Sequence, residues 1–317
     1  MSDRPLVSAV IIFLDAAEFI DEAIQSVMSQ TYEHWELLLV DDGSTDRSTA
    51  IALHYAHRYP DKVRYLEHPG HANRGMSATR NLGIVHARGR FIGFLDADDV
   101  WLPHKLQQQV QWLEVYPQAA MVYGRTLIWY SWMSDRPAGK TDRFYDLGVK
   151  ANTLVAPPRL LLLLLRNRVQ TPTTCNALLR RELVAHVGGF EPEFTGMFED
   201  QVFFAKVELT SYVVVADACW ALYRQHPGNS SGMGWNTQAY HDARVRFLTW
   251  VECYLSVHRV HHLRVWWVLW SELRPYRYPR LHRLASRFSQ VVGRSRANMT
   301  TAVRHVLRRA LARQPRC

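Results

Sequence analysis

The chain has 317 residues, 48% of them hydrophobic, which is enough for a sizeable core in one large domain or in a domain with appendages. It contains no run of about 18 apolar residues, so we expect no membrane-spanning helix. The net charge of +9 is uneven, because residues 275–317 carry eleven arginines and no acidic residue, which leaves −2 for residues 1–274. The basic character therefore belongs to the C-terminal tail, and nucleic-acid binding is not expected.

The N-terminal residues and the cysteines favour a cytoplasmic protein. Residues 1–5 lead directly into an apolar segment and lack the hydrophobic region of a signal peptide. Cys175, Cys219, Cys253 and Cys317 are far apart and form no CxxC pair, which is typical of reduced thiols and not of a disulfide or zinc framework.

Hydrophobic patterns in the first 125 residues predict alternating strands and helices. In chain order, we expect a strand at 7–13, a helix at 18–30, a strand at 35–40, a helix ending near 58, a strand at 63–66, a helix at 77–87, a strand at 91–95, a helix at 103–116 and a strand at 119–123. This repeated order predicts an α/β fold, in which a mostly parallel, Rossmann-like sheet is flanked by helices on both faces.

Two of the expected strands end in clusters of acidic residues. The strand at 35–40 is followed by Asp41 and Asp42, and the strand at 91–95 is followed by three aspartates within residues 96–99. Because the carboxyl ends of parallel strands share one edge of a sheet, Asp42 and Asp98 should face the same crevice. Carboxylate oxygens suit Mg²⁺ or Mn²⁺, which can bridge a protein carboxylate to a diphosphate. A structural alternative, compatible with the first, is that Asp99 caps the helix that runs through Pro103.

Two other nucleotide-binding folds are disfavoured by their glycine motifs. No GxGxxG segment follows the first strand, which argues against a dinucleotide site. Residues 70–77 (GHANRGMS) nearly match the phosphate loop of nucleoside triphosphatases, but Met76 stands where the phosphate-binding lysine is needed.

Taken together, five motifs resemble glycosyltransferase family 2, whose members have the GT-A fold. They are 7–15 (VSAVIIFLD), 40–46 (VDDGSTD), 73–83 (NRGMSATRNLG), 94–99 (FLDADD), and a set in the second half made of 188–190 (GGF), 198–200 (FED) and 223–226 (YRQH). Their order and spacing are similar to the family's over about residues 5–232. The first motif departs from the family's pattern, because it lacks the usual proline, tyrosine and asparagine.

The resemblance implies a role for each matching residue. Asp200 would be the general base, and Asp42 would bind the base of the nucleotide. Asp96 and Asp98 would form the family's Asp-x-Asp motif, and the implied metal ligands are Asp98, Asp96 and His226. The implied substrate-binding residues are Phe13, Asp15, Asp42, Arg80, Asp96 and Glu199. The cofactor would be Mn²⁺ or Mg²⁺, the donor a nucleoside diphosphate sugar, with a UDP-sugar preferred, and the acceptor a saccharide or a lipid-linked molecule.

Such a transfer has two physical requirements. The departing nucleoside diphosphate carries about two negative charges, which a divalent cation neutralises. The acceptor hydroxyl is a poor nucleophile until a base takes its proton, an effect of roughly 10²–10⁴-fold on the rate. One base opposite the leaving group gives inversion at the anomeric carbon. The alternative function is a non-catalytic nucleotide-sugar or carbohydrate-binding protein on the same fold, and for Asp200 the structural alternative is a charge at a helix N-terminus.

We expect residues 1–232 to form the transferase domain and residues 233–317 a helical extension with a basic amphipathic tail. Polar and turn-forming residues at 131–158 predict a flexible acceptor-binding loop, and the leucines at 160–165 predict a core helix. In the tail, apolar residues at helical spacing alternate with arginines, a pattern typical of a helix on an anionic membrane. The chain would then lie at the inner face of the plasma membrane. Equally, the tail could pack on the domain and expose its basic face to water.

Overall fold

The computed structural model describes residues 4–226, 228 and 237–279. They belong to two compact units that divide after Val268, and only the first unit holds the sheet and the candidate site. The expected domain boundary near residue 232 and the tail from residue 280 onward lie outside the described residues.

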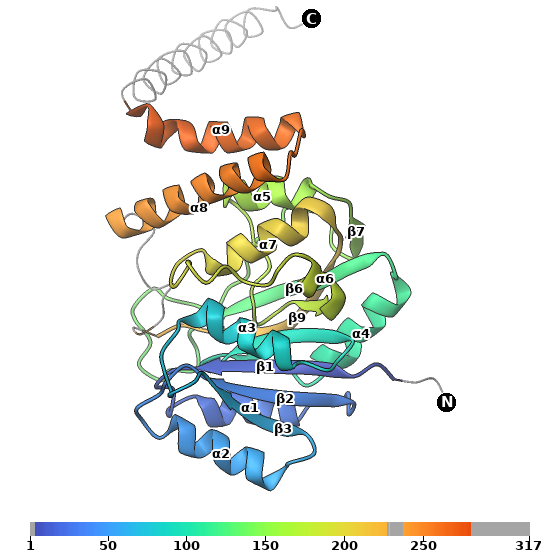
Figure 1. The fold of residues 1–317 in the computed structure, drawn as a ribbon, viewed down its shortest axis with the longest axis vertical. Helices are drawn as coiled ribbons and strands as arrows, with labels where there is room; N and C mark the ends of the chain where they lie inside the picture. Colours follow the sequence, from blue (N-terminus) through green and yellow to red (C-terminus); the bar gives the residue numbers. More distant parts are fainter. Residues whose placement is uncertain (1–3, 227, 229–236, 280–317) are drawn as a thin grey trace, which may run out of the picture. The chain divides into compact units, whose positions relative to one another are not determined.

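The described part of the chain contains one nine-stranded sheet (Figure 1). The strands are β1 Val7–Phe13, β2 Trp35–Asp41, β3 Val63–Glu67, β4 Phe91–Asp96, β5 Val100–Trp101, β6 Ala119–Trp129, β7 Thr153–Val155, β8 Leu178–Arg180 and β9 Tyr212–Arg224. Along the sheet they lie in the order β3-β2-β1-β4-β8-β6-β9-β5, and β7 also pairs with β9. The first four strands are parallel to one another, β6 is parallel to β9, and β5, β7 and β8 run antiparallel to their neighbours. The expected α/β fold with a mostly parallel sheet is confirmed.

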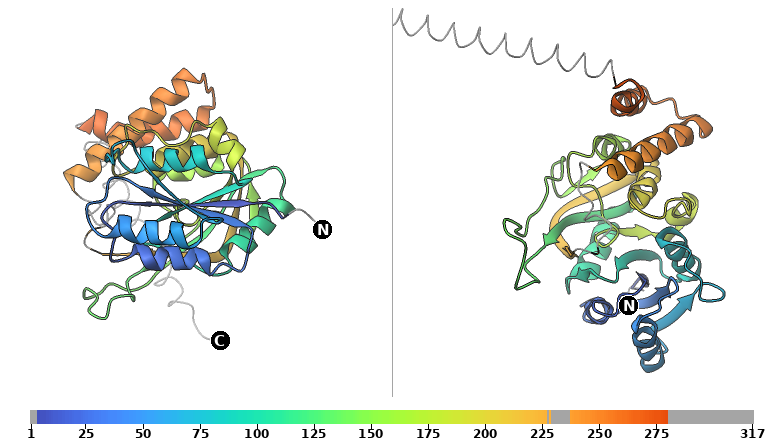
Figure 2. Two further views of the ribbon diagram at one scale, coloured as in Figure 1. Left: turned by 60° about the horizontal axis from the view of Figure 1, so that its bottom comes forward. Right: turned by 90° about the vertical axis from the view of Figure 1, so that its left-hand side faces the viewer.

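Helices cover both faces of this sheet (Figure 2). The helices of the described residues are α1 Ile20–Met28, α2 Ser48–Arg58, α3 Met76–His86, α4 Lys105–Val115, α5 Arg159–Arg166, α6 Arg181–His186, α7 Glu199–Thr210, α8 Gln238–Val257 and α9 Leu263–Arg277, and not all of them contact the sheet. On one face, α1, α2 and α4 bury their apolar side chains against the sheet in a single hydrophobic cluster. On the other face, α3 lies across β1 and β2 (Figure 2). Every residue of β1 and β2 is buried, as is typical of parallel strands covered on both sides.

The end of β6 extends beyond the expected strand at 119–123 and reaches Trp129. Register shifts interrupt its pairing with β9 around Arg125, and a Cβ atom on Gly124 would lie only 2.3 Å from the carbonyl oxygen of Ala218. This close approach of two backbones requires glycine and produces a bulge. After the bulge, β6 continues beyond residue 123, where the strand was expected to end, and its second half reaches the candidate site.

The structural alternative for Asp99, that it caps the helix running through Pro103, is wrong. Helix α4 begins at Lys105, six residues later, and makes no side-chain cap contact with Asp99. Instead, Asp99 is buried and its Oδ1 accepts a hydrogen bond from the backbone N–H of Arg224, 3.0 Å away. Asp99 therefore ties the end of β4 to the end of β9.

Candidate functional site

Acidic residues follow two strands at one edge of the sheet. Strands β2 and β4 flank β1 and run parallel to it, so their carboxyl ends lie at the same edge, as the sequence predicted. Asp42 follows β2 directly, and Asp98 follows β4 by two residues. The acidic cluster is therefore produced by the strand order and not by closeness in sequence.

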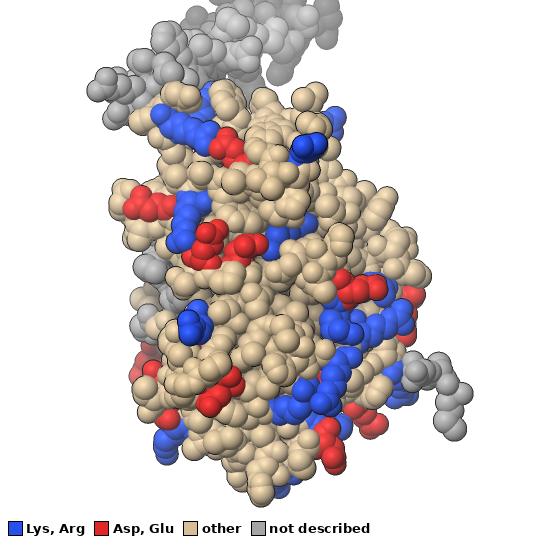
Figure 3. All heavy atoms as spheres, viewed as in Figure 1, with Lys and Arg blue, Asp and Glu red and all other residues tan. Residues whose placement is uncertain are grey.

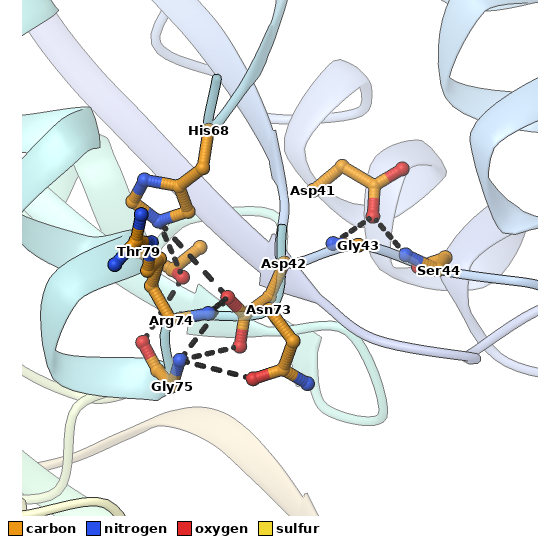
Figure 4. Close-up of polar contacts among 9 residues, drawn as sticks. All are labelled: Asp41, Asp42, Gly43, Ser44, His68, Asn73, Arg74, Gly75 and Thr79. Atoms are coloured by element: carbon orange, nitrogen blue, oxygen red, sulfur yellow. Dashed lines mark hydrogen bonds and ion pairs between the residues drawn. The ribbon is translucent and has the colours of Figure 1, made fainter. Parts of the chain in front are cut away.

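Asp42 is buried and fastens the loop that precedes α3 (Figure 4). Its Oδ1 accepts hydrogen bonds from the backbone N–H groups of Arg74 and Gly75, at 2.7 and 3.2 Å, and its Oδ2 accepts from Gly75 at 3.0 Å. The Nε2 atom of His68 lies 4.0 Å from Oδ1. The sequence predicted that Asp42 contacts the base of the nucleotide. In the structure, Asp42 holds the backbone of residues 74 and 75 in place and so shapes this part of the sheet edge.

The first motif forms the neighbouring part of this edge. Asp15 has a left-handed backbone, with φ of 48°, and its Oδ1 accepts hydrogen bonds from the backbone N–H groups of Thr45 and Asp46, at 2.6 and 3.1 Å. The side chain of Phe13 is only 3% exposed and packs in the hydrophobic core. Any contact between Phe13 and a ligand would therefore come from its backbone.

Asp98 and His226 form a close pair beyond the end of β4. The Nε2 atom of His226 lies 3.0 Å from Oδ2 of Asp98, and the ring of Phe19 packs 4.9 Å from the imidazole. Burial, and next the charge of Asp96, raise the pKa of Asp98, whereas the hydrogen bond with His226 opposes this rise. Among the described residues, no cluster of three or more histidine, cysteine or acidic side chains is arranged to hold a metal ion. At this position the protein provides one carboxylate and one imidazole as potential metal ligands, so the remaining ligands of a bound ion would have to come from elsewhere.

Arg80 joins the acidic strand end to helix α7. Its guanidinium is only 1% exposed, and it donates to Oδ1 of Asp96 at 2.6 Å and to Oε1 of Glu199 at 3.0 Å. The ring of Phe190 lies 5.2 Å from the guanidinium carbon, and Oδ2 of Asp96 accepts a hydrogen bond from the hydroxyl of Thr174 at 3.1 Å. The resemblance implies that Arg80 binds the substrate, and in the structure its guanidinium is engaged by two carboxylates.

Helix α7 places two acidic residues in its first turn. The preceding residue, Phe198, has φ of 73°, a left-handed conformation that bulky residues rarely adopt. This turn directs Glu199 toward Arg80 and leaves Asp200 half-buried on the wall of a cavity. Burial, followed by the charge of Glu199, raises the pKa of Asp200 to about 8. A carboxylate with a raised pKa in a partly dry cavity has the properties of a general base.

The cavity has a volume of about 530 Å³ and brings together residues from distant parts of the chain. Of the residues predicted from the sequence, it is lined by Asp96, Asp98, Glu199 and Asp200. His226 joins this group through Asp98, and Arg80 joins it through Asp96 and Glu199. Phe13, Asp15 and Asp42 do not line the cavity and lie at the neighbouring part of the sheet edge.

Sequence reasoning assigned no role to Arg224, although this residue lies in the YRQH motif. Its buried guanidinium donates through Nε to the backbone oxygen of Asp98, at 2.6 Å, and forms an ion pair with Glu22. Three aromatic rings surround the guanidinium, with centroids 4.6 to 5.1 Å from its carbon; they belong to Phe19, Trp129 and Trp132. Because these rings come from separate segments, no sequence pattern identified the cluster. Together with its hydrogen bond to the backbone oxygen of Asp98, the enclosed Arg224 fixes the backbone at that residue.

The model of the family described as glycosyl transferase family 2 matches residues 8–188, more than half of the chain. Among curated proteins, the putative glycosyltransferase EpsE of Bacillus subtilis is 36% identical over 114 residues, which cover 36% of this chain and 40% of EpsE. The Escherichia coli protein WfgD, a UDP-Glc:α-D-GlcNAc-diphosphoundecaprenol β-1,3-glucosyltransferase, is 36% identical over 108 residues, which cover 34% of this chain and 41% of WfgD. The chain thus spans about two fifths of the length of these relatives.

Two solved structures share the fold. The S. aureus TarS fragment 1–349, in complex with UDP-GlcNAc, superimposes with a TM-score of 0.58 and 17% identity, over 77% of this chain and 65% of the fragment. The mannosyltransferase PcManGT from Pyrobaculum calidifontis, in complex with GDP-Man and Mn²⁺, gives a TM-score of 0.55 and 19% identity, over 96% of this chain and 81% of PcManGT. At these identities the likeness is one of fold.

Proposed function

This chain belongs to glycosyl transferase family 2 and is a glycosyltransferase, and we propose that it moves a sugar from a nucleoside diphosphate sugar to an acceptor hydroxyl, with inversion and with Mn²⁺ or Mg²⁺ as cofactor. The observation that carries the proposal is that Asp98 and Asp200, from opposite parts of the chain, line the same cavity. The ligands of TarS and PcManGT, UDP-GlcNAc and GDP-Man with Mn²⁺, support the donor class and the metal. We propose a UDP-sugar as donor.

The residues at the sheet edge fit a divalent cation whose ligands come partly from the protein and partly from a diphosphate. Magnesium-type ions commonly bind through one or two carboxylates, with substrate phosphates and water completing the shell. Asp98 and His226, 3.0 Å apart, would supply protein ligands. Asp96 would contribute mainly as a neighbouring charge, because both of its oxygens already accept hydrogen bonds. When bound, the ion would neutralise the charge of the departing diphosphate.

Asp200 would act on the acceptor. As the acceptor oxygen forms its bond to the anomeric carbon, its proton passes to the carboxylate of Asp200, and the bond from that carbon to the diphosphate breaks. The electron pair of the broken bond leaves with the nucleoside diphosphate, so the step is balanced. A single displacement of this kind inverts the anomeric carbon. Asp42 and Asp15 would shape the part of the edge that holds the nucleoside, mainly through the loops that they fasten.

The test of the metal site uses Asp98→Ala in the full chain. We expect Mn²⁺ to strengthen UDP binding by the wild type, and the variant to lose at least about tenfold of that metal-dependent affinity, or about 1.4 kcal/mol. Without metal, the two proteins should bind UDP equally. Titration calorimetry with and without Mn²⁺ measures both, and Asp61→Ala, an exposed carboxylate in the α2–β3 loop, is the matched control. Equal metal-dependent affinity in Asp98→Ala would contradict the proposed ligand role.

The alternative function, a non-catalytic sugar-binding protein on the same fold, predicts donor binding without turnover. Release of UDP from a donor in the presence of an acceptor separates the two possibilities. The presence of both Asp98 and Asp200 at one cavity favours the enzyme.

For its cellular location, we propose a protein at the inner face of the plasma membrane. None of the helices in the described ranges is long and apolar enough to cross a bilayer. The proposed attachment rests on the +11 charge of residues 275–317. On the face shown in Figure 3, the described residues present both basic and acidic side chains, and residues 1–274 as a whole carry −2.

A further inference from the structure

His71 connects two loops at the part of the sheet edge that Asp42 shapes, and the proposed reaction assigns it no role. It belongs to the β3–α3 loop, and its Nε2 atom lies 2.8 Å from the backbone oxygen of Ser44, in the β2–α2 loop. Its Nδ1 atom lies 2.7 Å from Oε2 of Glu67, at the end of β3. One imidazole therefore bridges the end of a strand and the loop of the neighbouring strand.

The backbones of these two loops are in close contact at Gly43. A Cβ atom there would lie 2.8 Å from the backbone oxygen of His71 and 2.9 Å from the backbone nitrogen of Asn73. In the same β3–α3 loop, the carboxylate of Asp42 holds the N–H groups of residues 74 and 75 (Figure 4). The position of His71 is therefore coupled to the backbone that shapes this part of the edge.

The contacts of His71 are part of a closed circuit of hydrogen bonds. The hydroxyl of Tyr65 lies between two carboxylates, 2.8 Å from Oε2 of Glu67 and 3.1 Å from Oδ2 of Asp41. The other oxygen of Asp41, Oδ1, accepts a hydrogen bond from the backbone N–H of Ser44 at 2.8 Å. Because the backbone oxygen of Ser44 faces His71, the circuit runs through both loops and returns to its start.

This circuit is complete only when both ring nitrogens of His71 carry a proton. The backbone oxygen of Ser44 can only accept a hydrogen bond. Hydrogen bonds from Tyr65 and next from His71 lower the pKa of Glu67, which therefore stays a carboxylate and also only accepts. Both nitrogens must then donate, which the imidazolium does, whereas the neutral ring turns one lone pair toward an oxygen.

The surroundings of the imidazole favour this charged form. The hydrogen bond to the backbone oxygen of Ser44, and next the one to Glu67, raise the pKa of His71, and the charge of Asp41 acts in the same direction. The other charged or titratable side chains of the two loops are exposed or have partners elsewhere; they are Asp42, Asp46, Arg47, His68 and Arg74.

We propose that His71 is a positioning residue for the donor: as an imidazolium it holds the β2–α2 and β3–α3 loops together around the nucleoside, and donor binding weakens when it loses its second proton. This inference rests on the proposed function, in which the nucleoside binds beside Asp42. The His71 side chain is 37% exposed, so the effect has the scale of an exposed charged pair, about threefold in affinity. Because the pKa of His71 is raised, this affinity is fully present below the ordinary histidine value of about 6.5 and is lost as the pH rises through the raised pKa.

Binding of UDP-glucose to the full chain without metal tests this, at about pH 6 and about pH 9, on either side of the expected transition. The variant is His71→Asn, because asparagine accepts the left-handed backbone at this position, where φ is 54°, and keeps an amide donor. We expect the wild type to bind about threefold more tightly than the variant at the lower pH and equally at the higher pH. Groups that titrate in both proteins cancel in this ratio. His57→Asn, at an exposed histidine of α2, should bind UDP-glucose as the wild type does at both pH values.

The protonation of His71 is measured separately, by NMR of the histidine rings in the full chain, where the signal of His71 is the one that His71→Asn lacks. Glu67→Gln removes the carboxylate and should lower the pKa of His71. A ratio of wild-type to His71→Asn affinity that is the same at both pH values, or a pKa of His71 that Glu67→Gln leaves unchanged, would overturn the proposal. A wild type that binds no UDP-glucose at either pH, although His71 titrates as expected, refutes the proposed function and not the hydrogen-bond circuit.

Discussion

Arg80 is the residue through which the two acidic parts of the site are held together. Its fork-shaped guanidinium reaches Asp96 at the end of β4 and Glu199 at the start of α7, and it is almost fully buried. Removing one partner from a buried ion pair leaves uncompensated charge, which typically costs about 3–5 kcal/mol. The arrangement of the acidic groups therefore depends on a side chain that does not itself line the cavity.

Replacement of Arg80 by lysine should separate charge from geometry. Lysine keeps the positive charge but cannot donate to both carboxylates in the fixed fork that arginine provides. We expect Arg80→Lys to fold with lower stability and to reduce turnover more than UDP affinity, and Arg80→Gln to lose more stability than Arg80→Lys. Denaturant unfolding, UDP titration and steady-state kinetics measure these quantities. Full turnover in Arg80→Lys would show that the bidentate geometry is unnecessary.

The raised pKa of Asp200 predicts how activity depends on pH. A base must be ionised to accept a proton, and burial raises the pKa of this carboxyl to about 8. Below that pKa, kcat/KM should therefore fall with decreasing pH, by about tenfold per unit when one proton is involved, and above it the rate should level off. A rate profile from about pH 6 to pH 9 measures this.

The variant Asp200→Asn is the companion measurement. The amide keeps the shape of the side chain but cannot accept the proton, so turnover should fall by at least about 10²-fold while UDP binding persists. Turnover within a few-fold of the wild type would mean that another group is the base and that Asp200 is a charge at the N-terminus of α7.

At the residue scale, the sequence identified the acidic groups but not their partners. Asp96, Asp98 and Asp200 could be selected because clustered acids follow an apolar strand or match a family motif. The sequence could not predict three other features: the burial of Phe13, the ion pairs that Arg80 forms with two carboxylates, and the aromatic rings around Arg224. Each of these depends on side chains that are distant in sequence and become neighbours only through the strand order.

At the scale of elements, helix α3 connects the fold to the site, because it carries Arg80 and lies across β1 and β2. Gly83 permits this close packing: a Cβ atom there would lie 2.4 Å from Cγ1 of Val10 and 3.4 Å from Cγ2 of Val40. The contact with Val10 is far shorter than a normal van der Waals distance. The helix or the strand would have to move, and Arg80 is one turn away on the same helix.

We therefore expect Gly83→Ala to destabilise the protein, although alanine favours helices over glycine by about 1 kcal/mol. Overpacking a core contact of this kind typically costs about 1–3 kcal/mol. Val85→Ala on the same helix, at a side chain that is 79% exposed, should change stability by less than about 0.5 kcal/mol. Urea unfolding of the three proteins measures the difference. A Gly83→Ala protein as stable as the wild type would show that α3 adjusts without strain.

The elements that the sequence predicted best are those with an unambiguous hydrophobic pattern. Strands β1, β2 and β4 are mostly apolar and β3 is less so, and all four agree with the expectation within a residue or two at their ends. β8 is only three residues long, and β9 mixes buried and exposed residues around its bulged pairing with β6. Such strands are determined by their neighbours in the sheet, which a local pattern does not contain.

At the scale of the whole molecule, the charge of the chain is divided by sequence position. Residues 1–274 carry −2, and residues 275–317 carry +11 without a single acidic residue. The candidate catalytic residues all lie before residue 232, so the cationic segment is separate from the chemistry. A segment of this charge is suited to an anionic surface, since each arginine near such a surface contributes about 1 kcal/mol.

We expect the full chain to bind vesicles that contain anionic lipid and to ignore vesicles of neutral phosphatidylcholine. Binding should fade with salt, because the screening length shortens from about 8 Å at physiological ionic strength to about 3 Å at 1 M. Co-sedimentation at low and high salt measures this. A variant in which the arginines between residues 280 and 317 are replaced by glutamine should remain in the supernatant while still binding UDP. If the wild-type chain itself stays in the supernatant with anionic vesicles at low salt, the membrane role is wrong, and the packing of the tail on the protein becomes the better explanation of its apolar residues.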